Sequence, residues 1–64
     1  MARQNLLDRY GVLIGFIDTK SDGRQAIHDK HGSLKGVYDP RSNQTLDKVG
    51  RLVGIGNILT TLLL

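Results

Sequence analysis

The chain has 64 residues, no cysteine, and nine lysines and arginines against six acidic residues, so its formal net charge at pH 7 is +3. The missing cysteines exclude disulfides and thiolate metal sites, and a chain this short buries too little surface to be comfortably stable without a partner. Eight glycines, two alanines and no glutamate disfavour a helical protein. We therefore expect one small domain that gains burial by oligomerisation.

From the N-terminus, a polar lead at residues 1–4 precedes two short strands, which we predict at residues 5–7 and 12–17. The second strand is apolar almost throughout, so we expect both of its faces to be covered. Two segments rich in turn-forming residues, DTKSDG at 18–23 and DPRSN at 39–43, read as connections between hairpins. The predicted hairpins span residues 5–18, 24–39 and 44–57. The fold we expect is all-β, an antiparallel meander of three repeated hairpins.

An eleven-residue unit recurs in these hairpins as DRYGVLIGFID, DKHGSLKGVYD and DKVGRLVGIGN. Each copy has Asp at the first position and Gly at the fourth, which fits a type I β-turn followed by a residue in the left-handed conformation. That combination commonly closes a short β-hairpin. The predicted turn-forming residues are Asp8 and Gly11, Asp29 and Gly32, and Asp47 and Gly50.

A leucine and a second glycine follow each predicted turn. The leucines are Leu13, Leu34 and Leu52, and the glycines two residues further on are Gly15, Gly36 and Gly54. At strand periodicity a leucine and its glycine share one face of the sheet. A glycine there leaves room for another backbone or a large side chain to come close. We expect the three leucines to supply contacts between subunits.

The C-terminal segment at residues 58–64 contains five large aliphatic residues among seven, which need burial against the sheet or a neighbouring subunit. Asn57 is a favoured helix N-cap, and the apolar residues after it have helical spacing. We therefore expect a short C-terminal helix. The alternative is a terminal strand, because Ile and Thr suit one. The residues expected to join the subunit interface are Ile58, Leu59, Leu62 and Leu63.

The repeated pattern D-K/R-x-G-x-L-x-G, followed by an apolar residue and Asp, resembles that of the small bacterial proteins called four-fold β-flower proteins. In that family, short two-stranded units are arranged around an axis. The resemblance covers roughly residues 6–57 and implies the same kind of arrangement here, although this chain has three units where the family name implies four. It implies no activity. Small phage and mobile-element proteins also use compact β-modules.

Catalytic and metal-binding residue sets are incomplete. His28 and His31 flank Asp29, but two histidines without a third fixed ligand are a poor metal site. No serine stands in a strained elbow motif beside a positioned histidine and acid, and no Gly-rich loop precedes a helix in a phosphate-binding pattern. We therefore expect no enzyme, no metal and no cofactor.

The basic residues allow a second interpretation. Arg9, Lys30 and Lys48 occupy the same position in each predicted tip, and a cluster of such residues binds phosphate with little sequence preference. The neighbouring aspartates reduce the local field, and the chain has few aromatic residues on which bases could stack. We interpret the chain as a non-enzymatic structural or interaction module that acts as a homo-oligomer, with a phage or mobile-element setting. The alternative is a small basic nucleic-acid-binding protein.

The ends of the chain give an expectation about location. The first residues, MARQNLLDRYG, lack the apolar core and cleavage site of a secretory signal peptide. The apolar runs at 12–17 and 58–64 are too short to span a bilayer. We expect a cytoplasmic protein, or a virion-associated one if it is phage-encoded.

Overall fold

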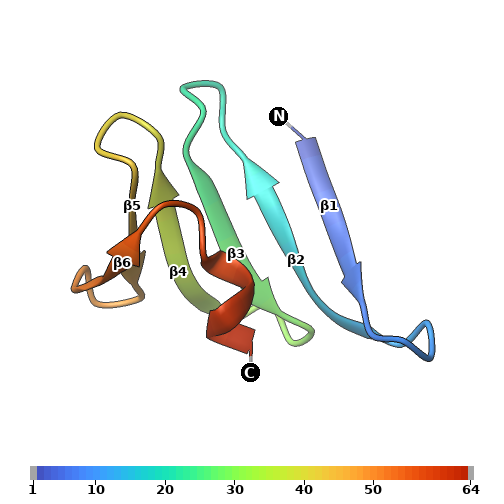
Figure 1. Cartoon of the computed structure of the whole chain (residues 1–64). Helices are drawn as coiled ribbons and strands as arrows, with labels where there is room; N and C mark the ends of the chain where they lie inside the picture. The colour runs from blue at the N-terminus through green and yellow to red at the C-terminus, as the bar shows by residue number, and fades with distance from the viewer. Residues whose placement is uncertain (1, 64) are drawn as a thin grey trace.

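The computed structural model describes residues 2–63 and contains one antiparallel sheet in which each strand pairs with its neighbours in sequence (Figure 1). The strands are β1 (Ala2–Leu7), β2 (Leu13–Thr19), β3 (Gln25–Asp29), β4 (Leu34–Asp39), β5 (Gln44–Asp47) and β6 (Leu52–Ile55). The only helix within the described residues is a 3-10 helix, η1 (Leu59–Leu63). The prediction of an all-β meander of hairpins is therefore confirmed, and the C-terminal segment forms one short 3-10 turn.

The first hairpin differs from its prediction in two ways. β1 begins at Ala2 because the supposed polar lead pairs with β2, Ala2 opposite Thr19 and Arg3 opposite Asp18. Polar side chains are tolerated there because β1 is an edge strand whose residues 2–5 are exposed. The prediction that β2 is covered on both faces is wrong for its first residues, since Leu13 and Ile14 are 38% and 40% exposed.

The three tips share one hydrogen-bonding pattern. In the third, Asp47 Oδ1 accepts the backbone N–H groups of Val49 and Arg51 at 3.0 and 2.9 Å, and the Gly50 N–H donates to the Asp47 carbonyl at 3.0 Å. Asp8 and Asp29 make the equivalent bonds in their own tips. The tip glycines have φ between 79° and 89°, the left-handed region that favours glycine. All three predicted turns are therefore confirmed.

A β-bulge interrupts each hairpin just after its tip. In the first, Leu7 pairs with Leu13 while Leu6 pairs with Gly15, so Ile14 is an extra residue on β2. The same shift occurs at Lys35 and Val53 in the other hairpins. Because side chains alternate along a strand, one extra residue moves the leucine and its glycine to opposite faces. The prediction that they share a face is therefore wrong.

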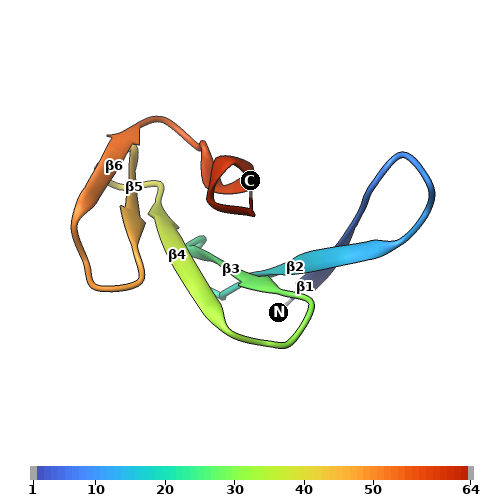
Figure 2. The same cartoon turned by 90° about the horizontal axis from the view of Figure 1, so that it is seen from below.

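The sheet curves so that the C-terminal turn lies on its concave side, over β3 and β4 (Figure 2). We call the face that carries η1 the inner face and the opposite one the outer face. Ile17, Ile27 and Leu59 form the core between the inner face and η1. Partly buried side chains pack around this core, namely Leu6, Tyr38, Leu62 and Leu63. A core of this size is small even for a chain of 64 residues.

The second glycine of each unit provides the space in which the C-terminal segment packs. A Cβ at Gly54 would lie 2.6 Å from Ile58 Cδ1, and one at Gly15 would lie 3.0 Å from Leu63 Cδ1. At Gly36 it would collide with Leu62 Cδ1. The prediction that these glycines leave room for another backbone or a large side chain is confirmed, since backbone carbonyl oxygens also lie close at Gly15 and Gly36. The three side chains come from residues 58–63 of the same chain.

Hydrogen bonds hold the start of this segment. Thr45 is fully buried, and its Oγ1 donates to the Gly56 carbonyl at 2.7 Å and accepts the Ile58 N–H at 3.2 Å. Asn57 Nδ2 donates to Gln25 Oε1 on β3 at 2.7 Å. The Asn57 Oδ1 accepts the Leu59 N–H at a long 3.4 Å, but Asn57 is not the predicted N-cap, because Ile58 accepts the first backbone bond of η1 and Asn57 lies one residue earlier. The segment is therefore fixed at its entry as well as by its leucines.

Candidate interaction surfaces

The outer face carries the repeated leucines in an exposed position. Leu13, Leu34 and Leu52 are 38%, 39% and 56% exposed. The strand register places all three on the outer face, with Leu7 and Ile55, which are also exposed. Each leucine lies between a hairpin tip and its bulge residue, so the repeat places a leucine at an equivalent position on each hairpin. The result is a set of partly exposed leucines at equivalent positions, which no other part of the described chain covers completely.

Beside these leucines, a row of stacked groups crosses the outer face from β1 to β3. The Arg3 guanidinium lies 4.3 Å from the Phe16 ring centroid, and the Phe16 and His28 rings stack at 4.8 Å. Arg3 also forms a bidentate ion pair with Asp18, at 2.8 and 3.3 Å. The hydrogen bond from Arg3 holds the pKa of Asp18 below its usual value. The charges of this row therefore cancel within the chain.

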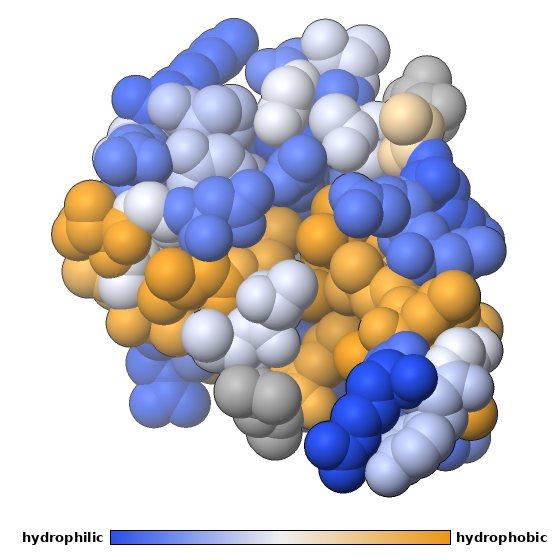
Figure 3. Space-filling view, turned by 45° about the vertical axis from the view of Figure 1, so that its right-hand side comes forward, coloured by the Kyte–Doolittle hydropathy of each residue, from blue (hydrophilic) through white to orange (hydrophobic). Residues whose placement is uncertain are grey.

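The predicted interface residues fall on two different surfaces. The three leucines of the units lie on the outer face, whereas the C-terminal segment lies on the inner face. Leu59 is only 1% exposed, so its burial is complete within one chain. Ile58, Leu62 and Leu63 are partly buried and retain some exposed apolar surface. A side view shows apolar surface continuing from the C-terminal turn to the β1–β2 hairpin (Figure 3).

The three hairpin tips lie at one end of the sheet (Figure 1). Arg9, Lys30 and Lys48 are exposed there, which brings the predicted phosphate-contacting residues to a common end of the molecule. Each stands beside a tip aspartate. Backbone N–H groups, chiefly those of Ser33 and Arg51, lower the pKa of Asp29 and Asp47 respectively, so these two carboxylates stay ionised at neutral pH. Negative charge therefore accompanies the basic row.

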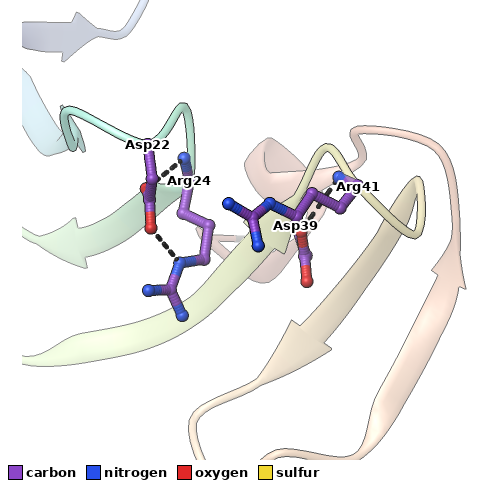
Figure 4. Close-up of polar contacts among 4 residues, drawn as sticks. All are labelled: Asp22, Arg24, Asp39 and Arg41. Atoms are coloured by element: carbon purple, nitrogen blue, oxygen red, sulfur yellow. Dashed lines mark hydrogen bonds and ion pairs between the residues drawn. The ribbon is translucent and has the colours of Figure 1, made fainter.

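The opposite end carries the two connections between hairpins, which lie side by side (Figure 4). Asp22 accepts the Arg24 N–H at 3.0 Å and Arg24 Nε at 2.7 Å, and Asp39 accepts the Arg41 N–H at 2.9 Å. The backbone bond from Arg24 is the main reason that the pKa of Asp22 is lowered, and the charge of Arg41 adds to it. These aspartates organise local turns, which is the structural role typical of Asp in such segments.

A shallow hollow on the inner face was missed by sequence reasoning. It lies beside the C-terminal turn, has a volume of about 370 Å³, and is bordered by aliphatic and basic side chains together. The signal for it was present in the second unit, where Lys35 replaces the aliphatic residue of the other two units.

The two histidines lie in different surroundings. His28 lies on β3 with its ring against Phe16, while His31 lies in the tip, where its backbone N–H donates to Asp29. No group of three or more His, Cys, Asp or Glu residues that could hold a metal ion occurs within residues 2–63. Over the same residues, no helix has the length and apolar character needed to cross a membrane.

In comparisons with known proteins, no protein-family model, curated protein or solved structure matches this chain.

Proposed function

We propose that the chain is a non-enzymatic structural or interaction module that acts as a homo-oligomer, with the leucines of its outer face at the subunit contact. The observation that carries this proposal is the exposure of Leu13, Leu34 and Leu52 at equivalent places on three hairpins. An uncovered patch of large apolar side chains on a small protein commonly marks an interaction site.

The total surface of the chain is compatible with a partner. The chain exposes 4448 Å², whereas a compact monomer of its mass, 7.1 kDa, exposes roughly 4100 Å² by the general scaling of surface with mass. In this single curved sheet, η1 covers part of one face and no described segment covers the other. Docking the outer face against another surface would remove apolar area from water, which is the main favourable term in association.

The charge distribution favours a second copy as that partner. The chain carries a net charge of +3, so most pairs of identical surfaces would repel one another. On the outer face, however, Arg3 and Asp18 form an internal ion pair next to the apolar residues. This face can therefore meet its own copy without bringing unpaired like charges together. Whether Ile58, Leu62 and Leu63 also contribute to subunit contacts stays a prediction.

Light scattering tests the proposal. We expect a molar mass above that of one chain at micromolar concentration, and a shift towards the monomer for Leu34→Asp and Leu52→Asp. Val49→Asp is the matched control, because Val49 is apolar and exposed at a tip but does not belong to the outer-face row. A folded wild-type monomer over the whole concentration range would overturn the proposal, as would equal dissociation by the control.

The resemblance to four-fold β-flower proteins, in which two-stranded units are arranged around an axis, is part of the same proposal. The contact of each hairpin's second glycine with the C-terminal segment is in keeping with it. A cytoplasmic or virion-associated location, with a phage or mobile-element origin, belongs to the same proposal. Knowledge of the neighbouring genes would test that part of it.

Nucleic-acid binding is the second candidate, and one observation favours it: Arg9, Lys30 and Lys48 lie at the same end of the sheet. Such an arrangement would contact phosphates with a strong dependence on salt. A heparin or DNA column that fails to retain the protein at low salt would remove this candidate. If the protein is retained, replacing all three residues by glutamine should lower the salt concentration needed for elution.

A further inference from the structure

Two kinds of side chain border the hollow on the inner face. Ile14, Leu62 and Leu63 supply aliphatic surface, and Lys30, His31 and Lys35 supply basic groups. They come from the β1–β2 hairpin, the β3–β4 hairpin and η1, segments far apart in sequence. Its volume, about 370 Å³, falls at the lower end of the range typical of small-molecule sites.

Comparison of the three units shows that the basic character of this hollow is specific to the second. At the third position of the unit the residues are Tyr10, His31 and Val49, and at the seventh they are Ile14, Lys35 and Val53. All three units form the same turn and the same bulge, so the fold does not require a basic residue at either position. A lysine beside Leu62 and Leu63 instead places a charge where the other units place an apolar side chain.

The charges around the hollow do not cancel. Among the described residues that border it, Asp29 is the only acidic one, and Oδ1 of that carboxylate already accepts the N–H groups of His31 and Ser33. Its Oδ2 lies 3.7 Å from Lys35 Nζ, which is a long ion pair. Within residues 2–63, Lys30 forms no ion pair. One carboxylate therefore faces two lysines and a histidine, which leaves a net positive potential beside an aliphatic surface.

We infer that this hollow binds an amphipathic anion, an aliphatic chain that ends in a single carboxylate or phosphate. The chain would lie against Ile14, Leu62 and Leu63, and the anion would contact Lys30 and Lys35. A nucleic-acid base is a poor fit because no Phe, Tyr or Trp side chain is among the described residues that border the hollow. A second copy of the protein is also a poor fit, since it would bring the same basic residues together. The inference does not require the oligomer proposed above, whose carrying contact is the outer face; it does require that Leu62 and Leu63 are not covered by a second subunit.

Binding of decanoate and decyl phosphate, measured by isothermal titration below their micellar concentrations, tests the inference. We expect saturable binding of both, and binding at least tenfold weaker for decanol, which lacks the anion, and for inorganic phosphate, which lacks the chain. Vesicles of phosphatidylcholine with and without phosphatidylglycerol distinguish the source. Binding to the free anions alone assigns a free ligand, while additional binding to the anionic vesicles assigns a membrane-borne one.

Matched variants separate this site from general electrostatic attraction. Lys35→Met should weaken decanoate binding at least tenfold and should fold normally, because the equivalent residues are Ile14 and Val53. Lys30→Gln should also weaken it. Lys48→Gln removes the equivalent charge from the third tip, away from the hollow, and should leave binding unchanged. Absence of decanoate binding to the wild type would overturn the inference, as would equal loss in the Lys35 and Lys48 variants.

Discussion

Ile58 Cδ1 lies 2.6 Å from the position that a Cβ on Gly54 would occupy. Equivalent contacts at Gly15 and Gly36 involve Leu63 and Leu62. The repeat therefore does more than place three hairpins next to one another. Its second glycine gives each hairpin a recess, and the C-terminal segment fills the three recesses with three aliphatic side chains.

Filling one recess should destabilise the fold. For Gly36→Ala, the new Cβ would collide with Leu62 and lie 2.5 Å from the Leu46 carbonyl oxygen, a backbone atom that cannot easily move. We expect a loss of about 1–3 kcal/mol in the free energy of unfolding, measured by urea denaturation. Gly54→Ala should cost less, because its close contacts are all with the flexible Ile58 side chain. Equal stability of Gly36→Ala and the wild type would contradict this packing.

The turns could be predicted from sequence because their chemistry is local. Asp47 and Gly50 lie within one four-residue turn, and the bonds between them depend on no distant residue. The bulges could not be predicted in the same way. Alternation along β2 suggests that Leu13 and Gly15 share a face. The register is set by β1, however, where two adjacent residues pair with Leu13 and Gly15 and leave Ile14 as an extra residue.

The candidate surfaces were predicted only in part. The apolar leucines were visible as a repeat, but whether the inner or the outer face would carry them depended on the bulge. Thr45 was overlooked, although a signal existed. The residues that pair with the second glycines are Leu6, Ile27 and Thr45, so a hydroxyl replaces an aliphatic group in the third hairpin alone. That substitution marks the place where the chain turns back over the sheet.

Removing this hydroxyl should loosen the C-terminal segment. Thr45→Val keeps the shape of the side chain but leaves the Gly56 carbonyl and the Ile58 N–H without their buried partner. We expect a loss of about 1–3 kcal/mol in the free energy of unfolding and faster hydrogen exchange at Ile58. Thr45→Ser, which keeps the hydroxyl and loses a methyl group, should cost about 0.8 kcal/mol. A valine variant as stable as the wild type would show that these bonds contribute nothing.

The tip aspartates should contribute more to stability than their exposed neighbours. Asp47→Ala removes the acceptor of two backbone N–H groups, and we expect a loss of about 1 kcal/mol, as for an ordinary hydrogen-bonding side chain. Lys48→Ala alters the adjacent exposed residue and should change stability by no more than about 0.5 kcal/mol. Thermal melting of the two variants side by side measures the difference. Similar losses in both would argue against the role assigned to the carboxylate.

The same carboxylates should make the fold sensitive to acid. Hydrogen bonds lower the folded-state pKa of four aspartates below the ordinary value of 3.8, and these are Asp18, Asp22, Asp29 and Asp47. A lowered pKa means that the folded state binds protons less readily than the unfolded state, so the stabilisation is complete above about pH 4 and is lost as the pH falls through the folded-state values. We expect urea denaturation at constant ionic strength to show a decline in stability from about pH 4 towards pH 2. Asp47→Asn, which cannot ionise, should make this decline shallower, whereas Lys48→Gln should not. Stability that stays constant between pH 5 and pH 2 would show that the aspartates titrate alike in the folded and unfolded chain.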